Sequence, residues 1–236
     1  MKLAIVTGGS RGLGAALCKH YIHAGWEVME FSRSAPFPFS YHIDLADPQF
    51  ALQRFVDVFS TVVGSDLSEV VAFNNAAVLG PVGPVEASSP ADVAVHMNVN
   101  VLSATLFACA VFAAFRDHAC PKTFVNISSG AATRGLAGWS LYCASKAAME
   151  NYVRAVALEQ QAREHPIRAF NVNPGVMNTD MQAEVRSASE HDFPDVEHYL
   201  RLQIEGRLGD PDDIAGEIAQ LVASHPEPAQ TYSIRL

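Results

Sequence analysis

The chain has 236 residues, of which 49% are hydrophobic and 17% are charged. This composition is typical of a folded globular chain and excludes an intrinsically disordered one. The net charge of −9 argues against a nucleic-acid-binding or membrane-binding surface, because both need clustered Lys and Arg. We therefore expect neither nucleic acid nor a membrane among its partners.

The cysteines and the apolar runs indicate where the protein resides. No two cysteines are spaced as CxxC, so we expect free thiols, no disulfides and no metal site. The four are Cys18, Cys109, Cys120 and Cys143. The apolar run at residues 3–6 is too short for the core of a signal peptide, and Val101–Phe115 is shorter than the roughly 20 residues of a membrane span. We expect a cytoplasmic protein.

Short β-branched runs alternate with segments of helical periodicity, which is the pattern of a parallel sheet covered by helices. The expected strands are Leu3–Val6, Glu27–Phe31, Ser40–Ile43, Val70–Asn74, Thr123–Ile127, Ile167–Val172 and Thr231–Ile234. The expected helices are Gly12–His23, Pro48–Val63, Pro90–Arg116, Leu141–Glu164 and Pro211–Ser224. We predict a single α/β domain over residues 1–236, with a doubly wound seven-stranded parallel sheet and helices on both faces.

Residues 178–207 differ in amino-acid composition from the rest of the chain. They mix Ser, Asp, His and Pro with scattered apolar residues, between the sixth expected strand and the last long helix. We predict that this segment is a mobile lid over the functional site.

A glycine-rich turn joins the first expected strand to the first expected helix. It reads Thr7-Gly8-Gly9-Ser10-Arg11-Gly12-Leu13-Gly14. Gly8 permits a tight turn, Gly12 lets the backbone approach a pyrophosphate, and Gly14 lets the helix pack closely. The helix N-terminus then offers unpaired N–H groups to phosphates. The turn predicts a dinucleotide site, with a purely structural turn as the alternative.

The end of the second strand indicates which dinucleotide is bound. Folds that prefer NAD place an acidic residue there, whereas this chain has Ser32 and Arg33, with Glu30 slightly earlier. Arg33 can form a fork with a 2′-phosphate, Ser32 can donate to it, and Arg11 points to the same neighbourhood. We predict NADP(H), the alternative being that Arg33 is an ordinary surface charge.

Two further strand ends offer cofactor contacts. Asp44 and Leu45 follow the third strand, where the carboxylate can accept from the adenine amine or, alternatively, cap the next helix. Asn75, Ala76 and Ala77 follow the fourth strand. Their small side chains leave space for the adenosine ribose, and Asn75 can bridge the backbone of neighbouring strand ends.

Tyr142 and Lys146 are four residues apart in an expected helix, so both project from one face. A free tyrosine, with a pKa of about 10, is a poor proton relay at neutral pH. We expect the lysine to favour the phenolate and lower that pKa. Taken alone, the pair could equally be a solvated surface.

Two other polar residues strengthen the catalytic interpretation. Ser129 ends the fifth strand, and hydroxyls at such strand ends face the ligand crevice. It can donate to a substrate carbonyl oxygen while Tyr142 delivers a proton. Asn100, in the helix Pro90–Arg116, can hold a water that links Lys146 to solvent, or can be a satisfied core amide.

In this order the motifs resemble those of the short-chain dehydrogenase/reductase family, and the likeness runs from Leu3 to about Val222. The family pattern TGxxxGxG corresponds to the glycine-rich turn, and NNAG to Asn74–Ala77 with alanine in the last place. YxxxK corresponds to the Tyr142/Lys146 pair, and PGxxxT to Pro174, Gly175 and Thr179. Within the family the chain is similar to sepiapterin reductases and bacterial benzil reductases. The segments that carry this are Val125–Ser129, Gly138–Ala144 and Pro174–Gln182.

The resemblance implies a Rossmann-type fold, an oxidoreductase activity and NADPH as hydride donor. It places Ser129 and Tyr142 on the carbonyl oxygen, and Lys146 on both the nicotinamide ribose and the phenol. It implies that Asn100 is the fourth catalytic residue. It places Thr179 and the Val176 backbone on the carboxamide of the cofactor. Three further residues of the same segment are expected to bind the cofactor, namely Pro174, Gly175 and Met181. It also implies a homodimer through the Ala-rich helices Pro90–Arg116 and Leu141–Glu164, whose alternative role is an internal core face.

We expect a small ketone or α-dicarbonyl as substrate, in contact with the apolar side chains of Leu79 and Trp139. The tail Thr231–Leu236 lacks the Asp with which animal sepiapterin reductases anchor a pterin, which disfavours that substrate. The alternatives are an acyl-carrier ketoreductase, an alcohol dehydrogenase or, in another class, an NADP-binding sensor without catalysis.

Overall fold

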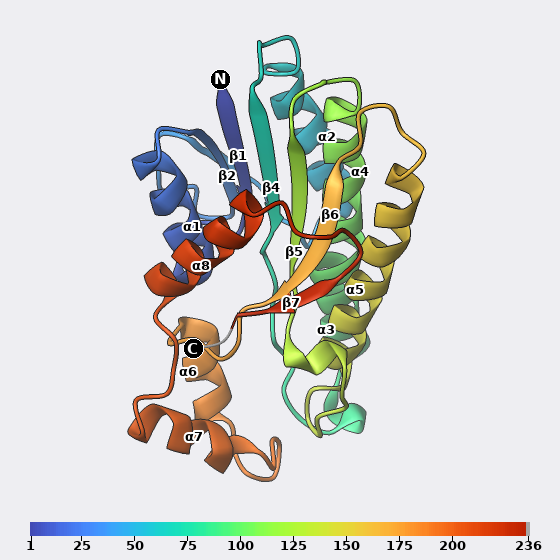
Figure 1. The fold of residues 1–236 in the computed structure, drawn as a ribbon. Coiled ribbons are helices and arrows are strands. Elements are labelled where there is room, and N and C mark those ends of the chain that lie inside the picture. The colour runs from blue at the N-terminus through green and yellow to red at the C-terminus, as the bar shows by residue number, and fades with distance from the viewer. Residues whose placement is uncertain (235–236) are drawn as a thin grey trace.

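One parallel sheet organises the molecule (Figure 1). The computed structural model describes residues 1–234, so Arg235 and Leu236 of the tail lie outside the described residues. The strand order is β3-β2-β1-β4-β5-β6-β7. The strands are β1 (Lys2–Thr7), β2 (Glu27–Ser32), β3 (Ser40–His42), β4 (Glu69–Asn74), β5 (Lys122–Ile127), β6 (Arg168–Asn173) and β7 (Thr231–Ser233). The prediction of a doubly wound seven-stranded parallel sheet is confirmed.

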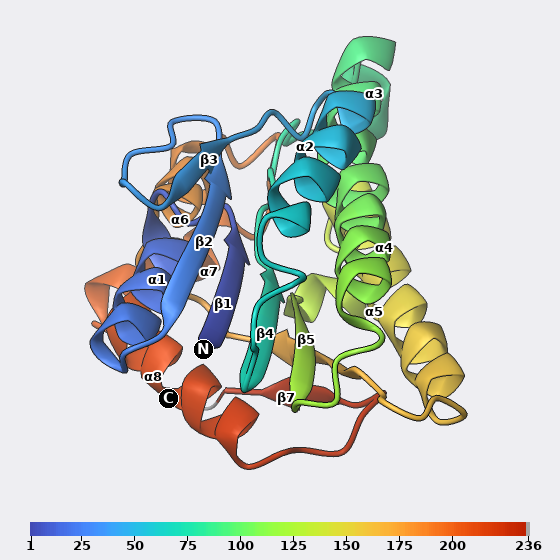
Figure 2. The same ribbon diagram turned by 90° about the horizontal axis from the view of Figure 1, so that it is seen from above.

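Helices cover both faces of this sheet (Figure 2). The α-helices are α1 (Gly12–His23), α2 (Pro48–Ser60), α3 (Pro90–Met97), α4 (Ala104–Phe115), α5 (Ser140–Gln160), α6 (Asp180–Ser187), α7 (Val196–Ile204) and α8 (Pro211–Ala223). Helices α2, α4 and α5 bury one apolar cluster against the sheet, and α1 and α8 bury another on the opposite face. Because both faces are covered, strands such as β4 are apolar without alternation.

The prediction of one continuous α-helix over Pro90–Arg116 is wrong in the middle of that range. A π-helical turn, η2 (Asn98–Ser103), separates α3 from α4. The side chain of Asn100 leaves the helix there and pairs with the backbone of Val78 at 2.8 Å through both its amide atoms. Such turns are often found at functional positions, and this one lies beside the loop that follows β4.

The helical run Pro90–Phe115 contains 26 residues with a mean hydropathy of 1.8 in its most apolar window. By length and composition alone this run could cross a membrane. The apolar stretch predicted from the sequence, Val101–Phe115, is therefore only part of a longer apolar helical run. Core helices of soluble proteins meet the same criteria, and 44% of that window is buried within this chain. Phe107 and Phe115 are fully buried in the core cluster beneath α4.

Residues 178–207, called here the cap segment, fold into α6 and α7 below the carboxyl ends of the strands (Figure 1). The sequence did not predict these helices. Their apolar side chains form a third buried cluster with Leu79, Trp139 and Tyr142. The indole of Trp139 stacks on Phe193 with ring centroids 4.5 Å apart and an interplanar angle of 5°. The cap segment therefore packs on the catalytic region, while its movement as a lid stays a prediction.

Candidate active site

A cleft of about 560 Å³ opens at the carboxyl ends of the strands. It lies where the strand order reverses between β1 and β4, which is the usual ligand position in such sheets. Every residue predicted to bind cofactor or substrate lines this cleft, as do Ser129, Tyr142 and Lys146. Asn100, behind the wall, does not. The structure thus brings together residues from the whole length of the chain.

The glycine-rich turn is held close to the end of β4. Gly8 has a φ of +69°, and a Cβ there would lie 2.9 Å from the backbone of Ala76. The Gly8 carbonyl and the Asn75 amide lie so close to Gly14 that any side chain at position 14 would displace them. The Asn75 amide donates to the carbonyls of Thr7 and Gly8 at 2.9 and 3.1 Å, which is the bridge between strand ends that the sequence predicted.

A buried carboxylate beneath this turn was not assigned a role from the sequence. Glu30 is fully buried and accepts from the Gly9 N–H at 2.9 Å and from the Ser32 hydroxyl at 3.1 Å. In this arrangement the Ser32 proton is donated to Glu30, so a contact of Ser32 with a 2′-phosphate would need its hydroxyl to turn and stays a prediction. Ser32 also accepts from the Ala35 N–H at 3.1 Å.

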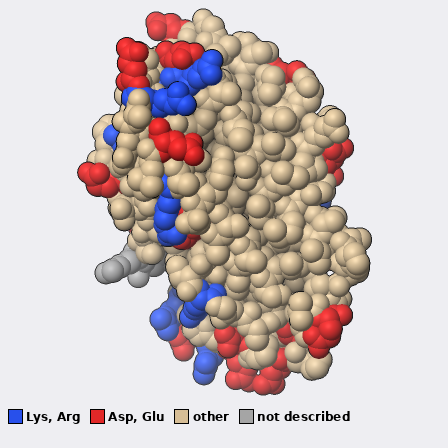
Figure 3. Space-filling view, turned by 90° about the vertical axis from the view of Figure 1, so that its right-hand side faces the viewer, with Lys and Arg blue, Asp and Glu red and all other residues tan. Residues whose placement is uncertain are grey.

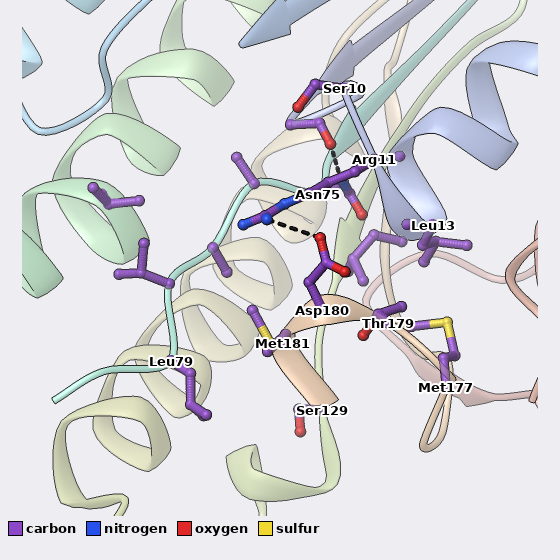
Figure 4. Close-up of a pocket in the computed structure, with 18 of the residues that line it drawn as sticks. Ser10, Arg11, Leu13, Asn75, Leu79, Ser129, Met177, Thr179, Asp180 and Met181 are labelled. Carbon is purple, nitrogen blue, oxygen red and sulfur yellow. Dashed lines mark hydrogen bonds and ion pairs between the residues drawn. The ribbon is translucent and has the colours of Figure 1, made fainter. Parts of the chain in front are cut away.

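The two candidate phosphate-binding arginines differ in their partners. Arg11 crosses the cleft to Asp180 of α6 at 2.9 Å, as Figure 4 shows, and so does not join Arg33. Arg33 is exposed at the rim and makes no ion pair within residues 1–234. Arg33 is thus the cation that remains available to a ligand at this end of the cleft.

Asp44 was considered both as a cofactor contact and as a helix cap. The structure gives the cap of α2 to Asp47, which accepts from the Phe50 N–H at 3.1 Å. Asp44 instead accepts from the Ala46 N–H at 3.0 Å and lines the cleft. The capping alternative for Asp44 is wrong, and its contact with a cofactor stays a prediction.

The predicted proton-transfer residues converge at the opposite end of the cleft. Ser129 and Tyr142 line the same end of the cleft, and the Ser129 hydroxyl is near enough to the phenol to lower its pKa. The Lys146 ammonium lies 5.6 Å from the centroid of the Tyr142 ring and donates to the Ile127 carbonyl at 2.8 Å. Tyr142 is 7% exposed and Lys146 8%. A small carbonyl compound could reach both hydroxyls from the cleft.

The electrostatics of this pair differ from the expectation. Burial raises the pKa of Tyr142 to about 12, although the neighbouring Ser129 hydroxyl lowers it. Burial lowers the pKa of Lys146 to about 8, and the nearby charge of Glu150 opposes that shift. The prediction that Lys146 lowers the pKa of Tyr142 is wrong here, because desolvation dominates and the ammonium donates to a backbone carbonyl.

A buried carboxylate on α5 fixes the strand end that carries Ser129. Glu150 is 2% exposed and accepts from the Ser128 hydroxyl at 2.6 Å. Its other oxygen accepts from Arg154 at 2.5 Å and from Thr231 at 3.2 Å. This network was not predicted from the sequence, although Glu150 follows Lys146 by four residues and so shares its helix face.

Aromatic and apolar side chains form the wall beyond Tyr142. Trp139 packs edge-on against Tyr142 with ring centroids 5.7 Å apart, and Tyr199 and Val185 from the cap segment line the same region as Leu79. Leu79 is labelled in Figure 4 opposite the glycine-rich turn. Leu79 and Trp139 were predicted from the sequence, whereas the residues of the cap segment were not, because their helices were not predicted.

Comparison with known proteins agrees with this geometry. Residues 2–190 match the family model described as short chain dehydrogenase. The chain is 34% identical over 240 aligned positions to a benzil reductase ((S)-benzoin forming) of Bacillus subtilis (strain 168), covering 100% of this chain and 99% of the relative. It is 33% identical over 160 positions to the sepiapterin reductase of Meriones unguiculatus, covering 66% and 59%.

Solved structures share the fold over the full length of the chain. The KRED1-Pglu enzyme superposes with a TM-score of 0.83 at 26% identity, covering 98% of this chain and 100% of that one. The YIR035C short-chain dehydrogenase/reductase of Saccharomyces cerevisiae gives 0.83 at 23% identity, with coverage of 99% and 96%. This chain is therefore a member of the short-chain dehydrogenase/reductase family and an oxidoreductase that acts on carbonyl or CH–OH groups.

Proposed function

We propose that this protein is an NADPH-dependent reductase of small aromatic or apolar ketones and α-dicarbonyl compounds. The observation that carries the proposal is the placement of Ser129 and Tyr142 in one cleft between a glycine-rich turn and an aromatic wall. Such a pair can donate to one carbonyl oxygen, and the turn can hold a dinucleotide beside it.

The residues at the dinucleotide end fit NADP(H). The turn offers the N-terminus of α1 and a close-packed backbone without side chains at Gly8 and Gly14. Arg33 supplies a free cation at the rim, where a 2′-phosphate can accept its fork. A structure with bound NADP belongs to a gluconate 5-dehydrogenase homologue that shares this fold at 23% identity. When bound, the cofactor would supply the hydride.

The protein's own residues would handle the proton. The Tyr142 phenol gives its proton to the developing alkoxide, while the Ser129 hydroxyl donates a hydrogen bond to the same oxygen. The Lys146 ammonium adds positive charge close to the phenolate that results. The Trp139 and Tyr199 rings exclude water from this end, because they close the wall against which Tyr142 is buried.

The aromatic wall, together with the similarity to benzil reductases, leads us to expect diketone reduction. We expect NADPH oxidation with benzil at a kcat/KM at least about tenfold above that with sepiapterin, because planar aromatic rings pack well against Trp139. Absorbance at the NADPH band measures both side by side, with an acyl-carrier β-ketoester mimic as a third substrate. A preference for sepiapterin or for the β-ketoester would assign the enzyme to that substrate class instead. Binding of NADP without turnover of any of the three would indicate a sensor.

We also propose that the enzyme is a homodimer through the outer surface of α4 and α5. Figure 3 faces this side of the molecule, and its broad centre is free of charged side chains. Leu102 is 47% exposed and Leu158 is 58% exposed. Sedimentation equilibrium should give twice the chain mass, and Leu158→Lys should give the monomer. The control is Ile204→Lys, at an 83% exposed position on α7, which should sediment like the wild type. A wild-type monomer would rule out the dimer.

A further inference from the structure

A histidine that no step above uses lies directly behind the catalytic residues. His96, near the end of α3, is fully buried. Its ring centroid is 6.5 Å from that of Tyr142, at an interplanar angle of 85°. It contacts two residues around the catalytic helix, since Nε2 lies 3.0 Å from Asn100 Nδ2 and 3.2 Å from the Ser145 hydroxyl.

The hydrogen bonds around Asn100 determine the orientation of its amide. Val78 N donates to Oδ1 and Nδ2 donates to the Val78 carbonyl, both at 2.8 Å. Reversing the amide would place oxygen against oxygen and NH₂ against N–H. Asn100 therefore presents its NH₂ group to His96, so His96 Nε2 must accept.

The contact of the other ring nitrogen independently indicates the same tautomer of His96. His96 Nδ1 lies 2.7 Å from the Gly80 carbonyl, which only accepts, so Nδ1 must carry the proton. The two Asn100 amide protons go to the nearer acceptors, the Val78 carbonyl and His96 Nε2, and Ser145 donates its own proton to the Tyr142 carbonyl at 2.9 Å. The contacts of His96 with Gly80 and Asn100 are both satisfied by one species, the neutral Nδ1–H tautomer.

Protonation of His96 would disturb this arrangement. Its Nε2–H could turn to the Ser145 oxygen at 3.2 Å, but the Asn100 N–H that donates to Nε2 would lose its acceptor in a buried site, where unpaired donors are costly. A shift of the Asn100 amide toward another acceptor would weaken its pairing with Val78, which belongs to the loop 76–79 that lines the cleft. The protonation state of His96 is thus coupled to the position of that loop.

We propose that His96 is a positioning residue: its neutral Nδ1–H tautomer aims the Asn100 amide at Val78 and so holds the loop after β4, and its protonation releases that loop. The kinetic part of this proposal rests on the proposed reductase function, whereas the tautomer and its effect on stability do not.

The charges around His96 support a neutral ring. Burial is the largest cause that lowers its pKa, and the Lys146 ammonium on α5 lowers it further, while hydrogen bonds to the Gly80 and Leu141 backbone raise it. Tyr142 is the other titratable group that faces the ring from α5. The loop from Ala76 to Pro81 carries no titratable side chain.

The sign of the pH effect follows from this shift. Because the folded chain binds this proton less readily than the unfolded chain, His96 destabilises the fold as pH falls below its ordinary pKa of about 6.5. We expect the midpoint of denaturation to fall more between pH 7 and pH 5.5 for the wild type than for a variant without this imidazole.

Two substitutions distinguish the role of the Nδ1 donor from that of the Nε2 acceptor. In His96→Gln the amide oxygen can take the place of Nε2 and accept from Asn100, but the donor to Gly80 is lost. In His96→Asn the amide nitrogen can take the place of Nδ1 and donate to Gly80, but the acceptor for Asn100 is lost. We expect His96→Asn to lose about tenfold in kcat/KM and His96→Gln to retain at least about threefold more than His96→Asn. In neither variant should the midpoint of denaturation fall between pH 7 and pH 5.5 as much as it does in the wild type. The control is His23→Asn, at an exposed position at the end of α1, which should behave as the wild type.

A measurement on the unsubstituted protein covers the case in which these variants do not fold. Long-range proton–nitrogen NMR of uniformly labelled protein should show, among its nine histidines, one Nδ1–H ring whose pKa lies below the ordinary value of about 6.5. Absence of such a ring would overturn the proposal, as would equal losses in the two variants or an unchanged pH dependence of stability. If the wild type reduces no carbonyl, the reductase function fails, while the NMR and denaturation results still decide the role of His96.

Discussion

Tyr142→Phe is expected to fold and bind NADPH normally, yet to reduce carbonyl substrates at least about a hundredfold more slowly than the wild type. The substitution removes only the hydroxyl, and the ring keeps its edge-on contact with Trp139 at 5.7 Å. The lost proton donor cannot be replaced by Ser129, whose hydroxyl is far less acidic when it acts alone. Turnover at saturating NADPH and quenching of protein fluorescence by NADPH measure the two properties separately.

A second tyrosine on the same helix provides the matched control. Tyr152 lies on α5 with its hydroxyl 3.7 Å from the Cys109 thiol, away from the cleft, so Tyr152→Phe should keep full turnover. Near-normal turnover of Tyr142→Phe would remove Tyr142 from the proton-donor role. A variant that no longer binds NADPH would show that its phenol acts mainly on the cofactor.

The pKa values give this reaction a defined pH dependence. With a pKa of about 12, Tyr142 holds its proton throughout the neutral range, as a proton donor in reduction must. Lys146, with a pKa of about 8, carries its positive charge only below that pH. Reduction should therefore slow as pH rises through about 8.

Arg33→Ala should narrow the preference for NADPH over NADH by about ten- to a hundredfold, the value of a charged hydrogen-bonded pair of about 1.5–3 kcal/mol. Arg33 is exposed at the rim and is paired with no other described side chain. The substitution should therefore remove only the contact with the 2′-phosphate of the cofactor. The ratio of the specificity constants for NADPH and NADH, measured with one carbonyl substrate, gives the effect.

Three further variants test this assignment of Arg33. Arg33→Lys keeps the charge but not the fork, so it should be intermediate. Arg163→Ala, exposed beyond the far end of α5, should leave the ratio unchanged. Arg11→Ala should change it less than Arg33→Ala, because Arg11 is paired with Asp180. An unchanged ratio in Arg33→Ala would contradict our assignment of cofactor preference.

The sheet and its main helices could be predicted because their signals are local. Gly12–His23 has the predicted bounds, since a glycine turn begins this helix and another glycine follows it. The same local reasoning failed at η2, where the determining contact joins Asn100 to Val78, 22 residues away in the chain. It also failed in the cap segment, whose short helices are stabilised by stacking on Trp139 and not by their own periodicity.

The candidate site shows the same division. Motif spacing predicted which residues line the cleft, because parallel strand ends must meet at one edge. Spacing could not show that Ser32 donates to Glu30, nor that desolvation dominates the pKa of Tyr142. Both depend on burial, which is a property of the assembled chain. The catalytic roles themselves stay predictions that the variants above would test.

The stacking of the cap segment on the catalytic helix has a consequence for how new substrates can be accommodated. Phe193 and Tyr199 pack against Trp139, and Tyr199 contributes to the raised pKa of Tyr142. A smaller residue at either position would enlarge the chamber and also hydrate the phenol. Altered selectivity would then come with a more acidic proton donor, so the choice of substrate and the acidity of Tyr142 would change together.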